Sequence, residues 1–146
     1  MRGQITIEAI LIFGIFLLII FSVSMPLAMK AKRQSLEVST VADARYAAEQ
    51  IVSLANSITF PGDKRTAEVY IPGDKGRGIN TSMNIVGGKY LITTVYFEED
   101  SPAVINLSLD GNNWMLWSDG NIGVFEDEGH RYRVEVSWGN ITCTRL

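Results

Sequence analysis

Residues 1–29 have the sequence MRGQITIEAILIFGIFLLIIFSVSMPLAM, and this stretch decides the fold. From residue 9 to residue 29, the only residues that are not plainly apolar are Gly14, Ser22, Ser24 and Pro26. At a rise of about 1.5 Å per residue, a helix of this length spans the roughly 30 Å hydrocarbon core of a bilayer. The run therefore predicts a segment that resides in a membrane.

Two ordinary interpretations account for this N-terminus incompletely. A secretory signal peptide has an apolar core of about 7 to 15 residues followed by a small-residue cleavage site. This run is longer, passes through Pro26 and continues into a charged segment. A plain bitopic anchor leaves Glu8 unexplained, because a carboxylate inside an apolar helix costs up to about 3 kcal/mol on insertion scales. The alternative for Glu8 is an interfacial acid favoured by the helix dipole.

The sequence Gly3-Gln4-Ile5-Thr6-Ile7-Glu8, followed by the apolar run, resembles the class III signal peptide of archaeal type IV pilins. Four features coincide: glycine before the cut, glutamine after it, threonine third and glutamate fifth in the mature chain. The resemblance implies that a prepilin peptidase cuts between Gly3 and Gln4, which removes a leader peptide of residues 1–3. It further implies a structural subunit of a surface filament, polymerised with itself or with pilus co-subunits by an assembly ATPase and a membrane platform protein.

The spacing of Gln4 and Glu8 has a physical meaning on a helix. Positions i and i+4 share one face, so the Glu8 carboxylate lies roughly 6 Å along the axis from the amine that processing creates at Gln4. The carboxylate can neutralise that amine or the amine of a neighbouring copy. Within the pilin family, the resemblance implies pairing with an adjacent subunit, which sets the axial register of the filament.

The resemblance also implies a location: a precursor in the cell membrane with its N-terminus in the cytoplasm and its head outside, and then an extracellular filament. One charge pattern opposes this orientation. Arg2 is the single cation before the run, whereas Lys30, Lys32 and Arg33 follow it, and the positive-inside rule places the more basic flank in the cytoplasm.

Beyond the membrane segment at residues 4–29, the helix is expected to continue as an amphipathic segment at residues 30–59. The apolar residues of this segment recur at intervals of three and four; they are Val38, Val41, Ala42, Ala48, Ile51, Val52, Ala55 and Ile58. Only Pro26 interrupts the pattern, so we expect one helix from Gln4 to Ile58, about 80 Å long and kinked near Pro26. Two helices meeting near Pro26 are the alternative.

Residues 60–146 predict a β-rich head. Short segments with alternating or β-branched residues recur between turn signals at roughly ten-residue spacing; they are residues 67–71, 79–86, 89–97, 103–109, 114–118, 122–125, 130–138 and 141–144. Gly87-Gly88 predicts a two-residue hairpin turn, and residues 73–78 predict a mobile loop. The expected fold class is α+β, a long N-terminal helix with a C-terminal antiparallel head.

Three sequons lie in the head, at Asn80, Asn106 and Asn140. Each is a candidate N-glycosylation site, which suits a surface outside the cell. The alternative is that polar strand residues match the pattern by chance. Residues 61–146 carry 8 Lys or Arg against 12 Asp or Glu, so this acidic head argues against a nucleic-acid partner.

Catalytic and metal-binding interpretations find little support. The chain has one histidine, His130, and one cysteine, Cys143, so neither a His-rich metal site nor an intrachain disulfide can form. We expect His130 to be a surface strand residue and Cys143 a small buried one. The Asp-Gly-Asn stretches at 110–112 and 119–121 lack the other ligands of a calcium loop and predict tight turns.

Two further features of the head have a functional and an ordinary interpretation. Residues 126–128, Glu-Asp-Glu, predict a solvated loop rather than a cation site. Trp114, Trp117 and Trp138 are expected in the core, with sugar stacking on an adhesive surface as the alternative.

The sequence therefore favours a major or minor pilin of an archaeal type IV pilus-like filament, with no enzymatic activity, cofactor or metal. The first alternative is a non-polymerising bitopic membrane protein with an extracellular binding or adhesion head. The second is a sugar-binding minor pilin that caps a filament of another subunit.

Overall fold

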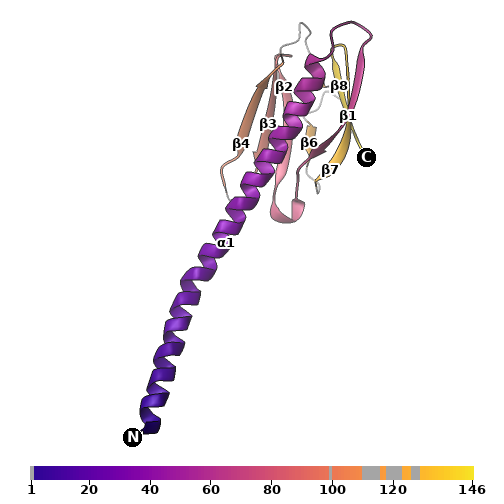
Figure 1. The fold of residues 1–146 in the computed structure, drawn as a ribbon. Helices are drawn as coiled ribbons and strands as arrows, with labels where there is room; N and C mark the ends of the chain where they lie inside the picture. The colour runs from indigo at the N-terminus through magenta and orange to yellow at the C-terminus, as the bar shows by residue number, and fades with distance from the viewer. Residues whose placement is uncertain (1, 99, 110–115, 118–122, 126–128) are drawn as a thin grey trace. The chain divides into compact units, whose positions relative to one another are not determined.

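The computed structural model describes residues 2–98, 100–109, 116–117, 123–125 and 129–146, with side chains described for residues 6–98, 100–109 and 129–146. The chain divides into two compact units, Met1–Val38 and Ser39–Leu146. The second unit, which we call the head, contains the end of the helix and all the strands that the structure describes (Figure 1). The fold class is α+β, as predicted.

One helix, α1, covers Arg2–Asn56 and continues through Pro26 without interruption. The alternative of two helices is therefore wrong, while the kink near Pro26 stays a prediction. After Asn56, the backbone N–H of Ser57 bonds to the carbonyl oxygens of Ser53 and Leu54, both at 3.1 Å. Such bonds tighten the last turn of a helix before it ends.

The head part of α1 buries a narrow stripe of mostly small residues. The buried members are Ala44, Ala47, Ala48, Ile51 and Ala55, followed by Ile58 just beyond the helix. The predicted stripe began too early, because Val38 is 71% exposed and Ala42 is exposed. Among the described side chains, Ala44 is the first buried residue of α1 and packs in a cluster with Ile79 and Val95, so the buried contact begins there.

The described residues of the head form eight strands and one short 3₁₀ helix. Their bounds are β1 Lys64–Ile71, η1 Lys75–Arg77, β2 Asn80–Val86, β3 Tyr90–Tyr96, β4 Ala103–Ser108, β5 Leu116–Trp117, β6 Gly123–Phe125, β7 His130–Ser137 and β8 Asn140–Arg145. They form two sheets, one ordered β1-β7-β8-β5 and the other β4-β3-β2-β6. Figure 1 shows β4, β3 and β2 on one side of the head part of α1, and β1, β7 and β8 on the other.

Both sheets and the helix share a core. Alternate strand residues point inward, such as Val69 on β1, Leu91 on β3 and Val134 on β7, and pack in one cluster with Ala48 and Ile51 of α1. A smaller cluster joins Ala44 to Ile79 and Val95. The head therefore satisfies its own apolar stripe internally.

Three local predictions need correction. β5 and β8 pair in parallel, whereas all the other strand pairs are antiparallel as predicted. β1 begins at Lys64, three residues earlier than predicted, because β7 is long enough to pair with the whole segment. The hairpin after β2 has a loop of residues 87–89, since Val86 pairs with Tyr90. Gly87 and Gly88 both adopt positive φ, as expected for the turn, and Lys89 is the added residue.

The predicted mobile loop at residues 73–78 is a hydrogen-bonded turn. Asp74 caps η1, accepting a hydrogen bond from the Arg77 backbone N–H on Oδ1 at 3.2 Å. Asp74 also forms a bridge with Ile79, and Gly78 ends the turn with φ +63. The aspartate at the start and the glycine at the end supply what a short helix needs at its two caps.

The remaining strand ends lie within a residue or two of their predictions. The outermost residues predicted for β5 and β6, namely 114, 115, 118 and 122, lie outside the described residues. So do the Asp-Gly-Asn turn predicted at 110–112, the second one at 119–121, and the predicted acidic loop at 126–128.

Candidate functional site

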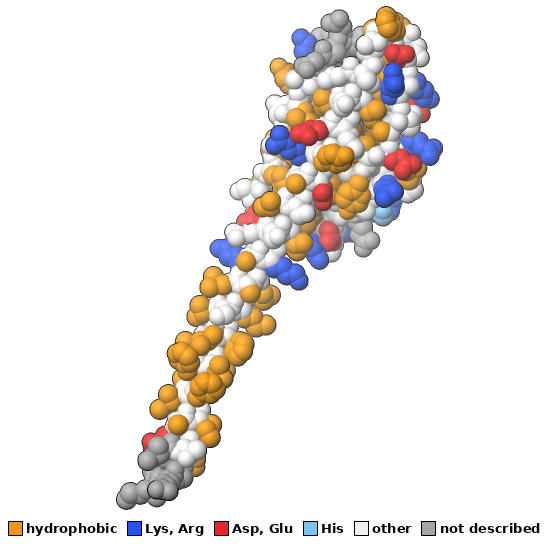
Figure 2. Space-filling view, in the orientation of Figure 1, with side chains coloured by type: hydrophobic (Ala, Val, Ile, Leu, Met, Phe, Trp, Pro, Cys, Tyr) orange, Lys and Arg blue, Asp and Glu red, His pale blue; other side chains and the backbone are white. Residues whose placement is uncertain are grey.

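The candidate site is the first part of α1, residues 6–29, which we call the apolar segment. Its large apolar side chains, from Ile7 to Met29, are 37–70% exposed. Figure 2 shows these side chains gathered along the N-terminal part of the helix, where few other kinds of side chain appear. None of the most apolar 18-residue window is buried. Within this chain, therefore, the apolar segment has no protein surface to cover it.

The apolar segment is compatible with insertion into a membrane. The helix is long and apolar enough to cross a bilayer, with a mean hydropathy of 2.7 in its most apolar window. Ser22 donates a hydrogen bond from Oγ to the Ile19 carbonyl oxygen at 2.8 Å. That bond gives the Ser22 hydroxyl a partner within its own helix. Membrane helices also tolerate a proline such as Pro26 when local polar groups compensate for its lost N–H.

Glu8 is the only charged residue between positions 3 and 29. Its side chain is exposed in the single chain. Gln4 and Glu8 both belong to α1, so their backbones are one turn apart, as the resemblance requires. Gly3 also lies in α1, which begins at Arg2 rather than at Gln4. A peptidase that cuts after Gly3 must therefore open the first turn of the helix.

Cations follow the apolar segment directly. Lys30, Lys32 and Arg33 are exposed, and Arg33 Nε bonds to Glu37 Oε1 at 3.0 Å. This pair follows the i, i+4 spacing that places opposite charges together on a helix surface. The change from an apolar to a charged surface marks where a bilayer interface would lie.

The three sequons differ in their surroundings. Asn106 and Ser108 are both exposed on β4. The carboxamide oxygen of Asn80 on β2 is inaccessible to solvent and has no hydrogen-bond partner among the described residues. Asn140 is half-buried at the start of β8. All three positions match the same sequence pattern. Only their exposure distinguishes them, because Asn106 is exposed and the other two are not.

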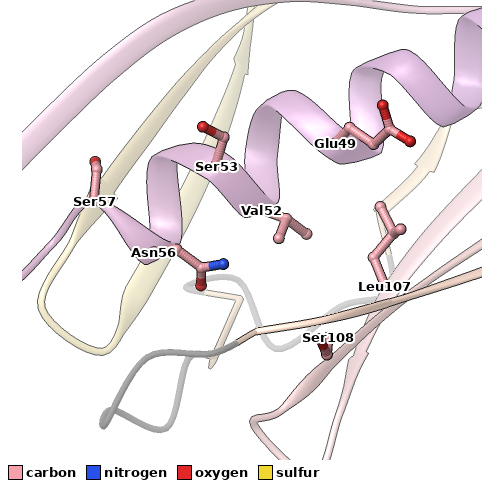
Figure 3. Close-up of a pocket in the computed structure, with 7 residues that line it drawn as sticks. All are labelled: Glu49, Val52, Ser53, Asn56, Ser57, Leu107 and Ser108. Atoms are coloured by element: carbon pink, nitrogen blue, oxygen red, sulfur yellow. The ribbon is translucent and has the colours of Figure 1, made fainter.

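Two open grooves flank the head part of α1, and the sequence did not indicate either of them. One, of about 580 Å³, is lined by Glu49, Val52, Ser53, Asn56, Ser57, Leu107 and Ser108, where the helix passes β4 (Figure 3). The other, of about 310 Å³, is lined by Asp43, Tyr46, Gln50, Glu68, Tyr70 and Arg131. The first groove contains one acid beside three serines, and the second contains two acids, Asp43 and Glu68; both are open surface features.

The remaining candidate residues have ordinary surroundings. His130 is partly buried on β7 and contacts Arg145 through its Nε2 atom. Cys143 is half-buried on β8 and packs against the core, so it is less buried than predicted. Trp138 is 40% exposed after β7, which makes the core prediction wrong for this residue. The side chains of Trp114 and Trp117 lie outside the described ones.

Among the described residues, no three His, Cys, Asp or Glu side chains come together in a way that could hold a metal ion. Comparisons of the chain with protein-family models, with characterised proteins and with solved structures gave no significant match. What the chain does is therefore inferred from its own residues.

Proposed function

We propose that this chain is a structural subunit, a major or minor pilin, of an archaeal type IV pilus-like surface filament. One observation carries the proposal: the head buries its own core, whereas the apolar segment is exposed on all sides and bears one acid near its start. A bilayer supplies a cover for such a helix before assembly, and identical helices supply one afterwards. The pilin-like sequence from Gly3 to Glu8 supports the second step.

The proposed pathway begins with a precursor in the membrane, with its N-terminus in the cytoplasm and its head outside. A prepilin peptidase opens the first turn of α1 and cuts between Gly3 and Gln4. The helix then leaves lipid for the filament core. Because lipid and a core of apolar helices are similarly apolar, this transfer has little net cost, and side-chain packing decides the geometry. An assembly ATPase and a membrane platform protein supply the work.

Glu8 sets the register in this pathway. The new amine of Gln4 in a neighbouring subunit pairs with the Glu8 carboxylate inside the apolar core. A buried pair of this kind adds little net stability, yet leaving one charge without its partner costs about 3–5 kcal/mol. A subunit that docks out of register pays that cost, so one carboxylate selects the correct position.

Intact-mass analysis of the protein from its native cells tests the cut. The wild type is expected to lack Met1, Arg2 and Gly3, and the Gly3→Val variant is expected to retain them, because a branched residue blocks the peptidase. Ile7→Val is the matched control, since it introduces the same residue nearby and leaves the cut intact. A wild-type protein that still begins with Met1 would overturn the proposal.

Filament yield tests the role of Glu8. A Glu8→Val variant is expected to be cut and to remain in the membrane, with at least about a 100-fold loss of filaments, as 3 kcal/mol or more implies. Glu37→Val makes the same change later in α1, outside the apolar segment, and should assemble. Normal filaments from the Glu8 variant would contradict the mechanism.

A non-polymerising bitopic protein with an extracellular binding or adhesion head is the second candidate. Its specific support is that a bilayer alone would cover the exposed apolar segment; the cluster of Lys30, Lys32 and Arg33 opposes an outside head in both candidates alike. This candidate predicts an intact Met1 and a dispensable Glu8, so the two experiments above separate it from a pilin.

A further inference from the structure

The two sheets of the head have very different outer surfaces. Strands β2, β3 and β4 together contain no Lys, Arg, Asp, Glu or His. Strands β1, β7 and β8, which make up most of the other sheet, contain seven charged residues and His130; the charged ones are Lys64, Arg65, Glu68, Arg131, Arg133, Glu135 and Arg145. The described strands on one side of the head are therefore uncharged, whereas those of the other sheet are not.

The pairing register identifies the outward residues of that neutral side. Inward residues such as Met83, Leu91 and Leu107 pack with the core. The outward residues form rows across β2, β3 and β4, which we call the neutral face; they are Asn80 and Tyr96, then Ser82, Thr94 and Val104, then Asn84, Ile92 and Asn106, and finally Val86, Tyr90 and Ser108.

The neutral face exposes apolar surface beside an open strand edge. Val104 is 64% exposed, Tyr90 48% and Tyr96 45%. β4 is the edge strand of its sheet and pairs only with β3 among the described strands. Edge strands in stable proteins are normally protected by charge, proline or a covering group, because an unprotected edge pairs with other chains. β4 contains neither a charge nor a proline.

A sequon lies on β4, at the edge of the neutral face. Asn106 stands beside Ile92, which stands beside Asn84. Asn106 and the Ser108 that completes its sequon are both exposed. In the sequon of Asn140, Asn140 itself is half-buried, and the Thr142 hydroxyl donates a hydrogen bond to the Glu135 carbonyl oxygen at 3.3 Å.

We propose that Asn106 is the occupied glycosylation site of this head and that its glycan covers the neutral face. The inference rests on the proposed function in one respect, that the head lies outside the cell. An N-linked glycan is bulky and solubilising. Sugar rings carry apolar C–H faces that pack on tyrosine rings, and hydroxyl groups that bond to amide and hydroxyl side chains. Tyr90, Asn84 and Thr94 supply those partners around Asn106.

The covalent step uses a lipid-phosphate-linked oligosaccharide as donor. The Nδ2 atom of Asn106 bonds to the anomeric carbon, and the bond from that carbon to the phosphate oxygen breaks. The phosphate leaves with the electron pair, and one proton leaves Nδ2, so no oxidation or reduction occurs. A membrane-bound transferase that recognises the sequon in an extended segment supplies the catalysis.

Trypsin separates the three sequons, which makes occupancy directly measurable on the full-length protein from its native cells. The expected peptides are 78–89 with Asn80, 90–131 with Asn106 and 134–145 with Asn140. We expect glycan mass on the 90–131 peptide and none on the other two. An unmodified 90–131 peptide, or a glycan carried only by one of the other two peptides, would overturn the proposal.

Two variants test the covering role. Asn106→Gln and Ser108→Ala both remove the sequon at exposed positions, so both should fold and lose the glycan. In detergent, each is expected to self-associate, with about a doubling of protein mass per particle in sedimentation. The control is Ser108→Thr, which keeps the sequon and should keep both the glycan and the dispersed state.

Two results would contradict the covering role. Variants that lose the glycan and stay as dispersed as the wild type show that the face needs no cover. The wild type could instead carry no glycan and associate through Tyr90 and Val104. A second copy of the chain would then be what covers the neutral face. Neither result depends on the N-terminus, so a retained Met1 or absent filaments would report separately on the proposed function.

Discussion

Residues 6–29 and residues 44–55 belong to the same helix, yet their apolar side chains have opposite surroundings. In the head part, a stripe of alanines and Ile51 lies against two sheets and is buried, while the rest of the surface is polar. In the apolar segment, large apolar side chains lie on every face of the helix and are exposed. A helix that is apolar on one stripe needs only a neighbour, whereas a helix that is apolar all round needs a solvent or a bundle that surrounds it.

The largest expected effect is on the buried stripe. Ala48→Glu places a charge at a position with no solvent exposure inside the core, so we expect a loss of about 4 kcal/mol or more in the free energy of unfolding of the head. Ala42→Glu, exposed on the same helix, should stay within about 0.5 kcal/mol of the wild type. Chemical unfolding in detergent, followed by tryptophan fluorescence, measures both. Equal midpoints for the two variants would show that the stripe is placed wrongly.

The next largest effect is expected when a large apolar side chain is shortened to alanine in each of the two regions. Ile51→Ala leaves a cavity beside the sheets and is expected to cost about 2–5 kcal/mol in the same unfolding assay. Ile15→Ala removes the same atoms from the apolar segment, where no cavity in this chain results, and should leave the unfolding of the head unchanged. If Ile15→Ala destabilised the head as much as Ile51→Ala, the division into two units would be incorrect.

A charge placed in the apolar segment should impair membrane insertion and leave the stability of the head unchanged. Leu17→Lys is expected to disfavour membrane insertion by about 2.5–3.5 kcal/mol, roughly a 100-fold shift in the inserted fraction. Val38→Lys, just after the charged flank, should insert normally. Alkaline extraction of membranes reports the inserted fraction, and unfolding of the head should be the same in both variants. Full retention of the Leu17 variant in membranes would argue against a spanning segment.

The smallest expected effect concerns the surface ion pairs of α1. Glu49→Ala removes the 2.8 Å contact with Arg45, and we expect a loss of about 0.3–0.5 kcal/mol because both partners are largely exposed. Glu37→Ala removes the corresponding pair with Arg33 outside the head and should not move the unfolding midpoint. A loss above about 1 kcal/mol for Glu49→Ala would mean that this residue also supports the nearby groove.

The sequence predicted the helix and the class of the head because both depend on local patterns. An apolar run of membrane length and short segments between turn residues are visible without any pairing. Where the buried stripe begins was not predictable, since Val38 and Ala42 fit the helical period as well as Ala44 does. Only the position of the sheets decides which of them is covered.

In the candidate site, too, the sequence predicted the features that depend on local patterns and missed those that depend on tertiary packing. Glu8, Gly3, Gln4 and the three sequons were found because they are patterns of neighbouring residues. The neutral face was missed, although the absence of charge in residues 80–86, 90–96 and 103–108 is plain in the sequence. Its meaning depends on register, because only the pairing of β2, β3 and β4 places Asn106 beside Ile92 and Asn84. The grooves beside α1 also depend on tertiary packing and left no local signal.

The pairing of β1 with β7 has a consequence for the order in which the head acquires its structure. Lys64 pairs with Ser137, 73 positions later in the chain, whereas β2 pairs with β3 and β3 with β4, in each case the next strand along the chain. Closing a long loop costs more entropy than closing a hairpin and slows folding. We therefore expect the neutral sheet to nucleate and the charged sheet to close last. Rapid-mixing kinetics should then show that Thr93→Ala slows refolding, while Val69→Ala mainly speeds unfolding.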